Sequence, residues 1–180
     1  MTRRIADAKA VQALVNRLAV KINTCNRGVK DLALVGIKRR GVPLAQRIAA
    51  RLNKTRKAKV PVGAIDITLY RDDLQMVAET PIVRGTKIDF DINGKTLVLV
   101  DDVVFTGRTI RAALSELLDF GRPRAIQLAA LIDRGHRELP IQPDFTGRAV
   151  KTSRSDLVDI CFTETDGRDE VVLTRRPERK

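Results

Sequence analysis

The feature that most constrains the fold of this chain is a series of short, mostly apolar runs. They occupy residues 31–37, 61–69, 97–100 and 125–132. A run without alternating polar residues predicts a strand that is buried on both faces, as the strands of a parallel sheet are. The chain should therefore build a sheet that is covered on both sides.

Segments with helical periodicity lie between these runs. From Asp7 to about Asn26, apolar residues recur at helical spacing, and Asp7 is a suitable N-cap. Residues 42–53 and 109–120 show the same period. Strands that alternate with helices predict an α/β fold, with a mostly parallel twisted sheet flanked by helices and joined by right-handed crossovers. We expect a single domain over residues 1–180, because this length suits one core and is short for two.

Two segments do not follow the alternation of strands and helices. Residues 70–93 are polar and irregular, and they contain Pro81 and Gly85. Such a stretch is too long for an ordinary connection, so we expect a flexible loop with a functional role. Residues 166–180 are expected to form a C-terminal tail.

Positive charge is concentrated in the first third of the chain. Residues 1–60 hold 16 Lys and Arg against two acids, a net charge of +14, whereas residues 61–180 hold 18 against 20, a net charge of −2. Such an excess favours polyanionic partners such as phosphates or nucleic acid. A solvated basic face is the alternative, also for the local cluster at residues 54–59.

The remaining composition narrows the class of protein. No apolar run approaches the ~20 residues that span a bilayer, so we expect no membrane segment. Cys25 and Cys161 match no metal spacing and are expected to be reduced thiols in the cytoplasm.

The run at residues 97–100 leads into the most informative motif, LVLVDDVVFTGRT. Asp101 and Asp102 end the strand, and residues 106–109 form a turn that opens a helix. Ligands of open parallel sheets lie beyond the carboxyl ends of the strands, and the first amides of a helix bind phosphate. Carboxylates accept hydrogen bonds from hydroxyls or hold hydrated Mg²⁺, so the motif suits a ribose 5-phosphate. An ordinary strand, turn and capped helix with two exposed acids is the alternative.

This motif resembles the phosphoribosyl pyrophosphate motif of type I phosphoribosyltransferases. The segments VGIKRRGVPLA, IDITLYRDDL and LIDRGHRELPI resemble one subfamily, the bifunctional pyrimidine operon regulators and uracil phosphoribosyltransferases, over about residues 7–165. The resemblance implies a type I phosphoribosyltransferase fold with a small hood and a homodimer or larger oligomer. It also implies that uracil and phosphoribosyl pyrophosphate become UMP and diphosphate, with Mg²⁺ required. A purine or orotate phosphoribosyltransferase is an alternative that the last two segments disfavour.

The resemblance also assigns residues to phosphoribosyl pyrophosphate and UMP. The implied binding segment consists of Asp101, Asp102, Val103, Val104, Phe105, Thr106, Gly107, Arg108 and Thr109. Within it, Asp101 and Asp102 would bind the ribose hydroxyls and hold Mg²⁺ through water and substrate, while residues 106–109 would take the 5-phosphate. Arg71 completes the implied catalytic set, because it would clamp the leaving group.

Two further segments complete the implied site. The pyrophosphate loop comprises Lys38, Arg39, Arg40 and Gly41. The base pocket comprises Ile132, Asp133, Arg134 and His136. Cations at a strand end suit the charge that develops on a leaving pyrophosphate, with a solvated basic turn as the alternative. His136 is the only histidine, and a lone histidine is more often structural than catalytic.

The resembled subfamily also binds a hairpin in the messenger RNA of pyrimidine genes, in response to uridine nucleotides such as UMP and UTP. The implied RNA-binding residues are Arg17, Arg137, Arg148, Lys151 and Arg154. This chain departs from the residues frequent in the subfamily at Asn16, Val20 and Gln142. An enzyme that has lost RNA regulation is therefore the alternative function.

Overall fold

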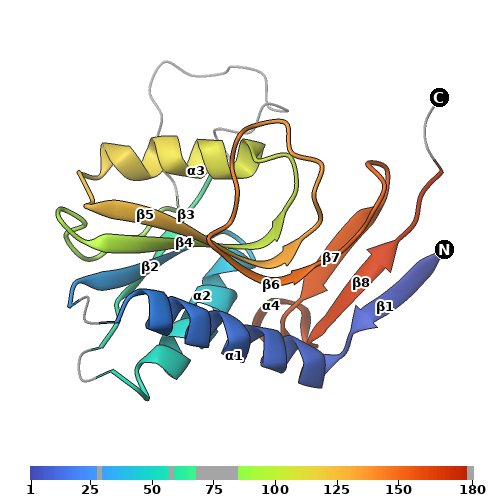
Figure 1. The fold of residues 1–180 in the computed structure, drawn as a ribbon, viewed down its shortest axis with the longest axis horizontal. Helices are drawn as coiled ribbons and strands as arrows, with labels where there is room; N and C mark the ends of the chain where they lie inside the picture. Colours follow the sequence, from blue (N-terminus) through green and yellow to red (C-terminus); the bar gives the residue numbers. More distant parts are fainter. Residues whose placement is uncertain (28–29, 57–58, 68–84, 178–180) are drawn as a thin grey trace.

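The computed structural model describes residues 1–27, 30–56, 59–67 and 85–177. Its main sheet has five strands in the order β3-β2-β4-β5-β6, and every neighbouring pair is parallel (Figure 1). These strands are β2 (Leu32–Ile37), β3 (Val62–Ile65), β4 (Thr96–Val104), β5 (Ala125–Asp133) and β6 (Phe145–Ala149). The four predicted apolar strands are all present, and β6 is a fifth that the apolar runs did not reveal.

Helices cover both faces of this sheet, as predicted. Helices α1 (Ala8–Cys25) and α2 (Gly41–Leu52) lie on one face, and α3 (Arg108–Asp119) lies on the other (Figure 1). Helix α1 begins where predicted, because the Asp7 carboxylate accepts a hydrogen bond of 2.9 Å from the backbone N–H of Ala10.

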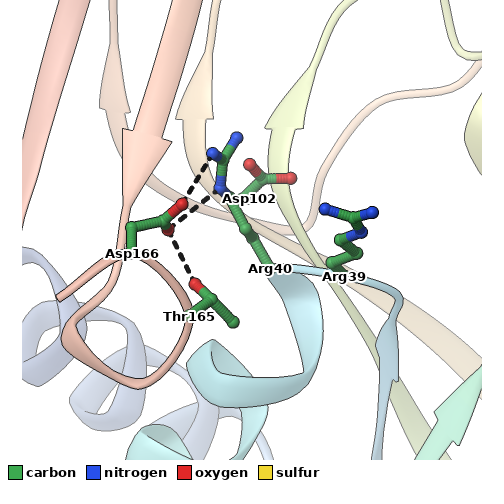
Figure 2. A pocket seen from close by; sticks show the side chains of 5 residues that line it. All are labelled: Arg39, Arg40, Asp102, Thr165 and Asp166. Atoms are coloured by element: carbon green, nitrogen blue, oxygen red, sulfur yellow. Dashed lines mark hydrogen bonds and ion pairs between the residues drawn. The ribbon is translucent and has the colours of Figure 1, made fainter.

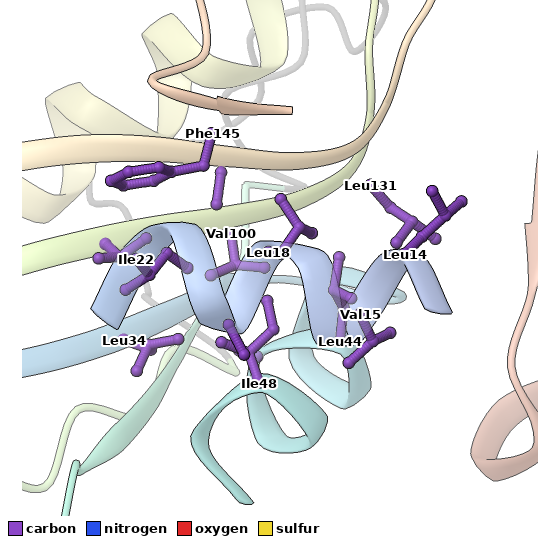
Figure 3. Close-up of a cluster of buried hydrophobic side chains, with 14 of the residues drawn as sticks. Leu14, Val15, Leu18, Ile22, Leu34, Leu44, Ile48, Val100, Leu131 and Phe145 are labelled. Atoms are coloured by element: carbon purple, nitrogen blue, oxygen red, sulfur yellow. The ribbon is translucent and has the colours of Figure 1, made fainter. Parts of the chain in front are cut away.

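The core therefore consists of two layers that share the central strand. Val100 of β4 packs with Leu18 of α1 and Ile48 of α2 (Figure 3), whereas Leu97 and Leu99 belong to the cluster on the α3 face. All five side chains are essentially inaccessible to solvent. Each such side chain contributes about 1.5–3 kcal/mol to folding. This double burial explains why β4 reads as a continuous apolar run.

A second, smaller sheet is antiparallel and has the strand order β1-β8-β7. It contains β1 (Thr2–Ala6), β7 (Leu157–Cys161) and β8 (Glu170–Thr174), with the short helix α4 (Thr163–Asp166) between the last two strands. Within the segment expected as a tail, β8 instead forms the central strand of this sheet. Residues 170–174 form a strand because buried and partly exposed side chains alternate along them, with Val171 and Leu173 buried.

The predicted loop at residues 70–93 is only partly covered by the structure. Arg71 lies outside the described residues, as does the segment 68–84. The described part is mostly exposed, but Lys87 pairs with Ala64 at the edge of the main sheet and Ile92 is 1% exposed. The last part of the expected loop is therefore attached to the core.

Candidate functional site

The acidic pair lies inside β4, not after it. The strand was expected to stop at Val100, but it continues to Val104. Asp101 is 5% exposed, and its Oδ1 accepts a hydrogen bond of 3.0 Å from the backbone N–H of Asp102. Only Asp102 lines a cavity. Of the two carboxylates expected to face the ligand, Asp101 is thus enclosed by the continuing strand, and its contact with a ligand stays a prediction.

The two carboxyl groups also differ electrostatically. Burial raises the pKa of Asp101 well above its ordinary value, and the neighbouring charge of Asp102 raises this pKa further. Burial also raises the pKa of Asp102, but the hydrogen bond from Asp101 and the positive charge of Arg40 oppose that rise. Asp102 is thus the member of the pair that has a cation facing it.

The cavity has a volume of about 240 Å³ and lies where the two sheets meet. Its lining side chains are Arg39, Arg40, Asp102, Thr165 and Asp166 (Figure 2). The arginines follow β2, Asp102 belongs to β4, and the other two residues belong to α4. The cavity is therefore at the carboxyl ends of two parallel strands, with its remaining wall supplied by the small sheet.

The predicted pyrophosphate loop connects β2 directly to α2. Its peptide bond between Lys38 and Arg39 is cis. Lys38 forms an ion pair with Asp66 at 3.6 Å, and it is not among the cavity residues. A side chain at Gly41 would have its Cβ 2.4 Å from the carbonyl oxygen of Val100, so only glycine fits there. Gly41 thus lets α2 begin against β4, which brings the arginines next to Asp102.

The two arginines of this loop differ in their contacts. Arg40 donates two hydrogen bonds to Asp166, from Nε at 3.2 Å and from Nη2 at 3.0 Å. Arg39 is exposed, and it has no hydrogen bond or ion pair to any other residue in the described part of the chain. One cation is therefore already paired, while the other is available to an anion.

The turn at residues 105–109, the predicted phosphate segment, leads directly into α3. Gly107 has a φ of 94°, which glycine adopts without strain, and α3 begins at the next residue. As the N-cap, Gly107 offers no side chain to the first amides of α3, although the Thr106 Oγ1 lies 3.4 Å from the N–H of Arg108. Unpaired amides at a helix start favour an anion.

Two of the predicted base-pocket residues, Arg134 and His136, are held by contacts with neighbouring segments. Arg134 is 5% exposed, donates a hydrogen bond of 2.8 Å to the carbonyl of Ser153, and stacks 4.0 Å from the ring centre of Phe105. The Nε2 of His136 lies 2.7 Å from the carbonyl oxygen of Thr152. These contacts join the segment after β5 to the turn after β4, and they give His136 a structural partner.

The predicted RNA-binding residues fall into two groups. Arg17 and Arg148 each donate a hydrogen bond to a backbone carbonyl, at 3.1 and 2.9 Å. Lys151 is exposed, and Arg154 forms an ion pair with Glu138. These four side chains lie at or near the surface.

Arg137, the fifth predicted RNA-binding residue, is an internal brace. Its side chain is 12% exposed and lies 2.7 Å from the carboxylate of Asp133. It also donates hydrogen bonds to the carbonyls of Phe105 and Ile141, at 2.8 and 2.9 Å. A guanidinium with these partners stabilises the loop around the site, so a contact from Arg137 to RNA does not fit the structure.

Sequence reasoning missed Thr165 and Asp166. They follow β7 in an acidic segment that resembles an ordinary solvated turn. Asp166 is 126 positions from its partner Arg40, so no local pattern connects the two. Only the pairing of the small sheet brings them together.

A metal ion could be held here only with help from a ligand. Among residues 1–27, 30–56, 59–67 and 85–177, no three His, Cys, Asp or Glu side chains are grouped to bind one. Mg²⁺ commonly uses one or two carboxylates, several waters and the phosphates of a substrate. Asp102 beside a phosphate fits that donor set. No helix in the described residues is long and apolar enough to cross a membrane.

Known proteins resemble this chain in sequence and in fold. Residues 1–155 match the family model of the phosphoribosyl transferase domain. A protein named Bifunctional protein PyrR from Roseiflexus is 57% identical over 165 residues, which are 92% of this chain and 90% of that protein. Another of that name, from Acetivibrio thermocellus, is 54% identical over 170 residues, 94% of this chain and 92% of that protein.

Solved structures support the fold alone, because their sequences differ greatly. A hypoxanthine phosphoribosyltransferase from Trypanosoma cruzi has a TM-score of 0.74 at 18% identity, with 96% of this chain and 94% of that chain covered. One from Staphylococcus aureus has a TM-score of 0.69 at 16% identity, with 97% and 93% covered.

Proposed function

Because this chain belongs to the phosphoribosyl transferase family, among the bifunctional PyrR proteins, we propose that it joins uracil to phosphoribosyl pyrophosphate, forming UMP and diphosphate, and regulates pyrimidine biosynthesis genes. One observation carries the enzymatic part. Asp102 faces the guanidinium groups of Arg39 and Arg40 across a single cavity at the carboxyl ends of β2 and β4. A diol and a polyanion are the ligand groups that such a cavity complements.

The ribose 5-phosphate would lie along the motif after β4. Asp102 accepts hydrogen bonds from the ribose hydroxyls, and the first amides of α3 receive the 5-phosphate beyond Gly107. Asp101 supports this arrangement from behind, because its carboxyl oxygen holds the N–H of Asp102. Asp102 thus contacts the ribose, and Asp101 holds the backbone of Asp102 in place.

The pyrophosphate would lie against the loop after β2. Negative charge grows on this group as the bond to the anomeric carbon breaks, and oxocarbenium character grows on the sugar. Arg39 and Arg40 stabilise the negative charge on the pyrophosphate, and the Asp102 carboxylate lies on the side of the positively charged sugar. Mg²⁺, when bound with the substrate, would neutralise further phosphate charge next to Asp102. We also assign Arg71 to the leaving group.

Uracil would enter between the turn after β4 and the segment after β5. Arg134 and His136 hold this wall in place through Phe105 and Thr152, so the exposed backbone there can read the carbonyl and N–H edges of a base. The solved neighbours named for hypoxanthine share only the fold, whereas the relatives at 54–57% identity carry the PyrR name. We therefore assign uracil rather than a purine.

The enzymatic proposal is tested by the formation of UMP from uracil and phosphoribosyl pyrophosphate with Mg²⁺. Asp102→Asn should lower kcat/KM by about 10²-fold or more, because it removes the anion that faces the sugar. Asp119→Asn is the matched control, since Asp119 is exposed at the end of α3 and should leave turnover unchanged. Near wild-type turnover by a folded Asp102→Asn variant would remove Asp102 from the site.

The regulatory part is binding to a hairpin in pyrimidine-operon messenger RNA, strengthened by UMP or UTP. The charge of +14 over residues 1–60 supports it, because phosphate contacts dominate such affinity. Arg17, Arg148, Lys151 and Arg154 remain the proposed contacts. We further propose that the protein works in the cytoplasm as a homodimer or larger oligomer. An enzyme without RNA regulation is the alternative, favoured by Val20, which is 65% exposed on α1 where the subfamily often has a polar residue.

A further inference from the structure

The cavity contains an anion of its own, which is unusual for a site that must receive a polyanion. Asp166 lines the cavity together with Arg40, and the two side chains meet in a two-pronged ion pair (Figure 2). Planar guanidinium and carboxylate groups pair well in this way. Arg40 therefore has a partner before any ligand arrives.

Asp166 is held rigidly in this position. The backbone N–H of Phe162 donates to its Oδ2 at 3.0 Å, and the hydroxyl of Thr165 donates to the same oxygen at 2.6 Å. Both donors belong to the turn that carries Asp166. The hydrogen bonds from Arg40 and Thr165 keep the pKa of Asp166 well below its ordinary value, so the carboxylate is charged at neutral pH.

A second acidic cluster on the same turn provides a contrast. Glu164 and Asp169 pair with Arg47, which lies further along α2, and neither lines the cavity. That cluster is sufficient to attach the turn to α2. The pairing of Arg40 with Asp166 is thus not the only attachment between α2 and the turn, and its distinctive property is its place in the cavity.

An anion at this place has a direct electrostatic effect on a phosphate ligand. Each phosphate group that approaches Arg40 must compete with Asp166 for the same N–H donors and is repelled by its charge. We propose that Asp166 is a positioning residue that keeps Arg40 at the cavity wall and lowers its affinity for pyrophosphate, so that this product can leave. The proposal rests on the proposed function, because it presumes that pyrophosphate is the group bound there.

The test is the affinity of the purified protein for inorganic pyrophosphate with Mg²⁺, measured by calorimetry. Asp166→Asn keeps the acceptor for Phe162 and Thr165 but removes the charge, and it should bind pyrophosphate about threefold tighter or more. Pyrophosphate should also inhibit its turnover at a correspondingly lower concentration. Asp166→Glu, which keeps the charge, should remain close to the wild type.

Two controls separate this role from a purely structural one. Glu164→Gln removes the same charge from the same turn outside the cavity, so it should not tighten binding. In an Arg40→Gln background, Asp166→Asn should have a smaller effect, because the competition for the Arg40 donors is gone and only the repulsion remains. Should Asp166→Asn fail to fold in thermal unfolding, Asp166→Ser provides the same removal of charge.

The outcomes also distinguish the two proposals. Wild-type turnover with uracil, together with unchanged or weaker pyrophosphate binding by the uncharged Asp166 variants, would overturn the role of Asp166 alone. Absence of both turnover and pyrophosphate binding in the wild type would overturn the proposed function and this inference with it. Tighter binding in Asp166→Asn that Glu164→Gln reproduces would show a general charge effect and would also overturn the inference.

Discussion

At the scale of single residues, neighbours in the sequence can have opposite surroundings. Asp101 and Asp102 are adjacent, yet one is enclosed and the other faces the cavity. Successive side chains of a strand point to opposite faces, so a strand that continues through both acids separates them. The sequence motif predicts where the pair lies. It does not predict this separation, because the length of β4 depends on its pairing with β5, which continues to Asp133.

The burial of Asp101 leads to a prediction about stability and pH. A carboxyl group with a raised pKa favours the protonated form in the folded state. The protonated Asp101 therefore contributes fully to the free energy of unfolding below the unfolded pKa of 3.8. This contribution is lost as the pH rises toward the higher pKa of the folded state. Asp101→Asn, which cannot ionise, should melt about 2–4 °C above the wild type at pH 8.

Thermal unfolding at pH 5 and at pH 8 checks this prediction. The melting difference between Asp101→Asn and the wild type should be larger at the higher pH. Asp119→Asn, at an exposed position, should show no such trend. An equal difference at both pH values would mean that Asp101 does not resist ionisation in the fold.

At the scale of elements, α2 is the connection between the two sheets. Arg40 and Arg47 are seven positions apart, which places them on one face of the helix, two turns from each other. Arg47 donates four hydrogen bonds of 2.6–2.8 Å to Glu164 and Asp169, and it stacks 4.9 Å from the ring centre of Phe162. The N-cap of α2 is thus a cavity cation, and the helix itself carries the attachment of the small sheet.

This attachment should be sensitive to acid. The Arg47 hydrogen bond lowers the pKa of Asp169 from 3.8 to about 2. A lowered pKa stabilises the fold above the unfolded value of 3.8, and the effect is lost as the pH falls toward about 2. Asp169→Asn should therefore reduce the free energy of unfolding by roughly 2 kcal/mol at pH 7.

Urea unfolding between pH 7 and pH 3 measures this loss. The difference between Asp169→Asn and the wild type should shrink toward the acid end of the range. Asp159→Asn is the control, because Asp159 is exposed on a strand of the same small sheet. A constant difference across the range would show that ionisation of Asp169 does not stabilise the attachment.

The elements also show what the sequence could and could not predict. Four of the five strands of the main sheet were predictable, because burial on both faces makes them largely apolar, as in residues 32–37, whereas the partly exposed β6 was not. The small sheet was not, because its strands are short and buried on one face, and β1 pairs with β8 across most of the chain. The same difference applies to the lining of the cavity. Arg39, Arg40 and Asp102 follow or belong to strands of the main sheet and were predicted, whereas Thr165 and Asp166 lie between strands of the small sheet and were not.

At the scale of the whole molecule, the charge is divided between the two parts of the chain. The basic third comprises β1, α1, β2, the loop after it and α2, while the rest is nearly neutral. Figure 1 shows α1 and α2 together on one face of the main sheet, away from α3. A long anion that binds this protein should therefore approach the α1 side.

The affinity for RNA should depend on salt concentration, because basic side chains would contact the phosphates. A pyrimidine-operon leader hairpin should bind more tightly than unrelated RNA, and the logarithm of its affinity should fall linearly with the logarithm of salt concentration. Arg148→Gln should reduce that slope by about 1. Arg122→Gln, an exposed change beyond α3, should leave it unchanged. Equal affinity for unrelated RNA would leave nonspecific attraction as the sole interaction.

The small sheet has a consequence for how the cavity comes into existence. Its central strand, β8, is the last strand of the described residues, and it pairs with β1, the first of them. A nascent chain still held in the ribosome could complete the main sheet and expose both loop arginines before β8 emerged. The wall with Thr165 and Asp166 would form only afterwards. The Arg40 guanidinium would therefore lack its carboxylate partner in the growing chain and be paired with Asp166 in the finished protein.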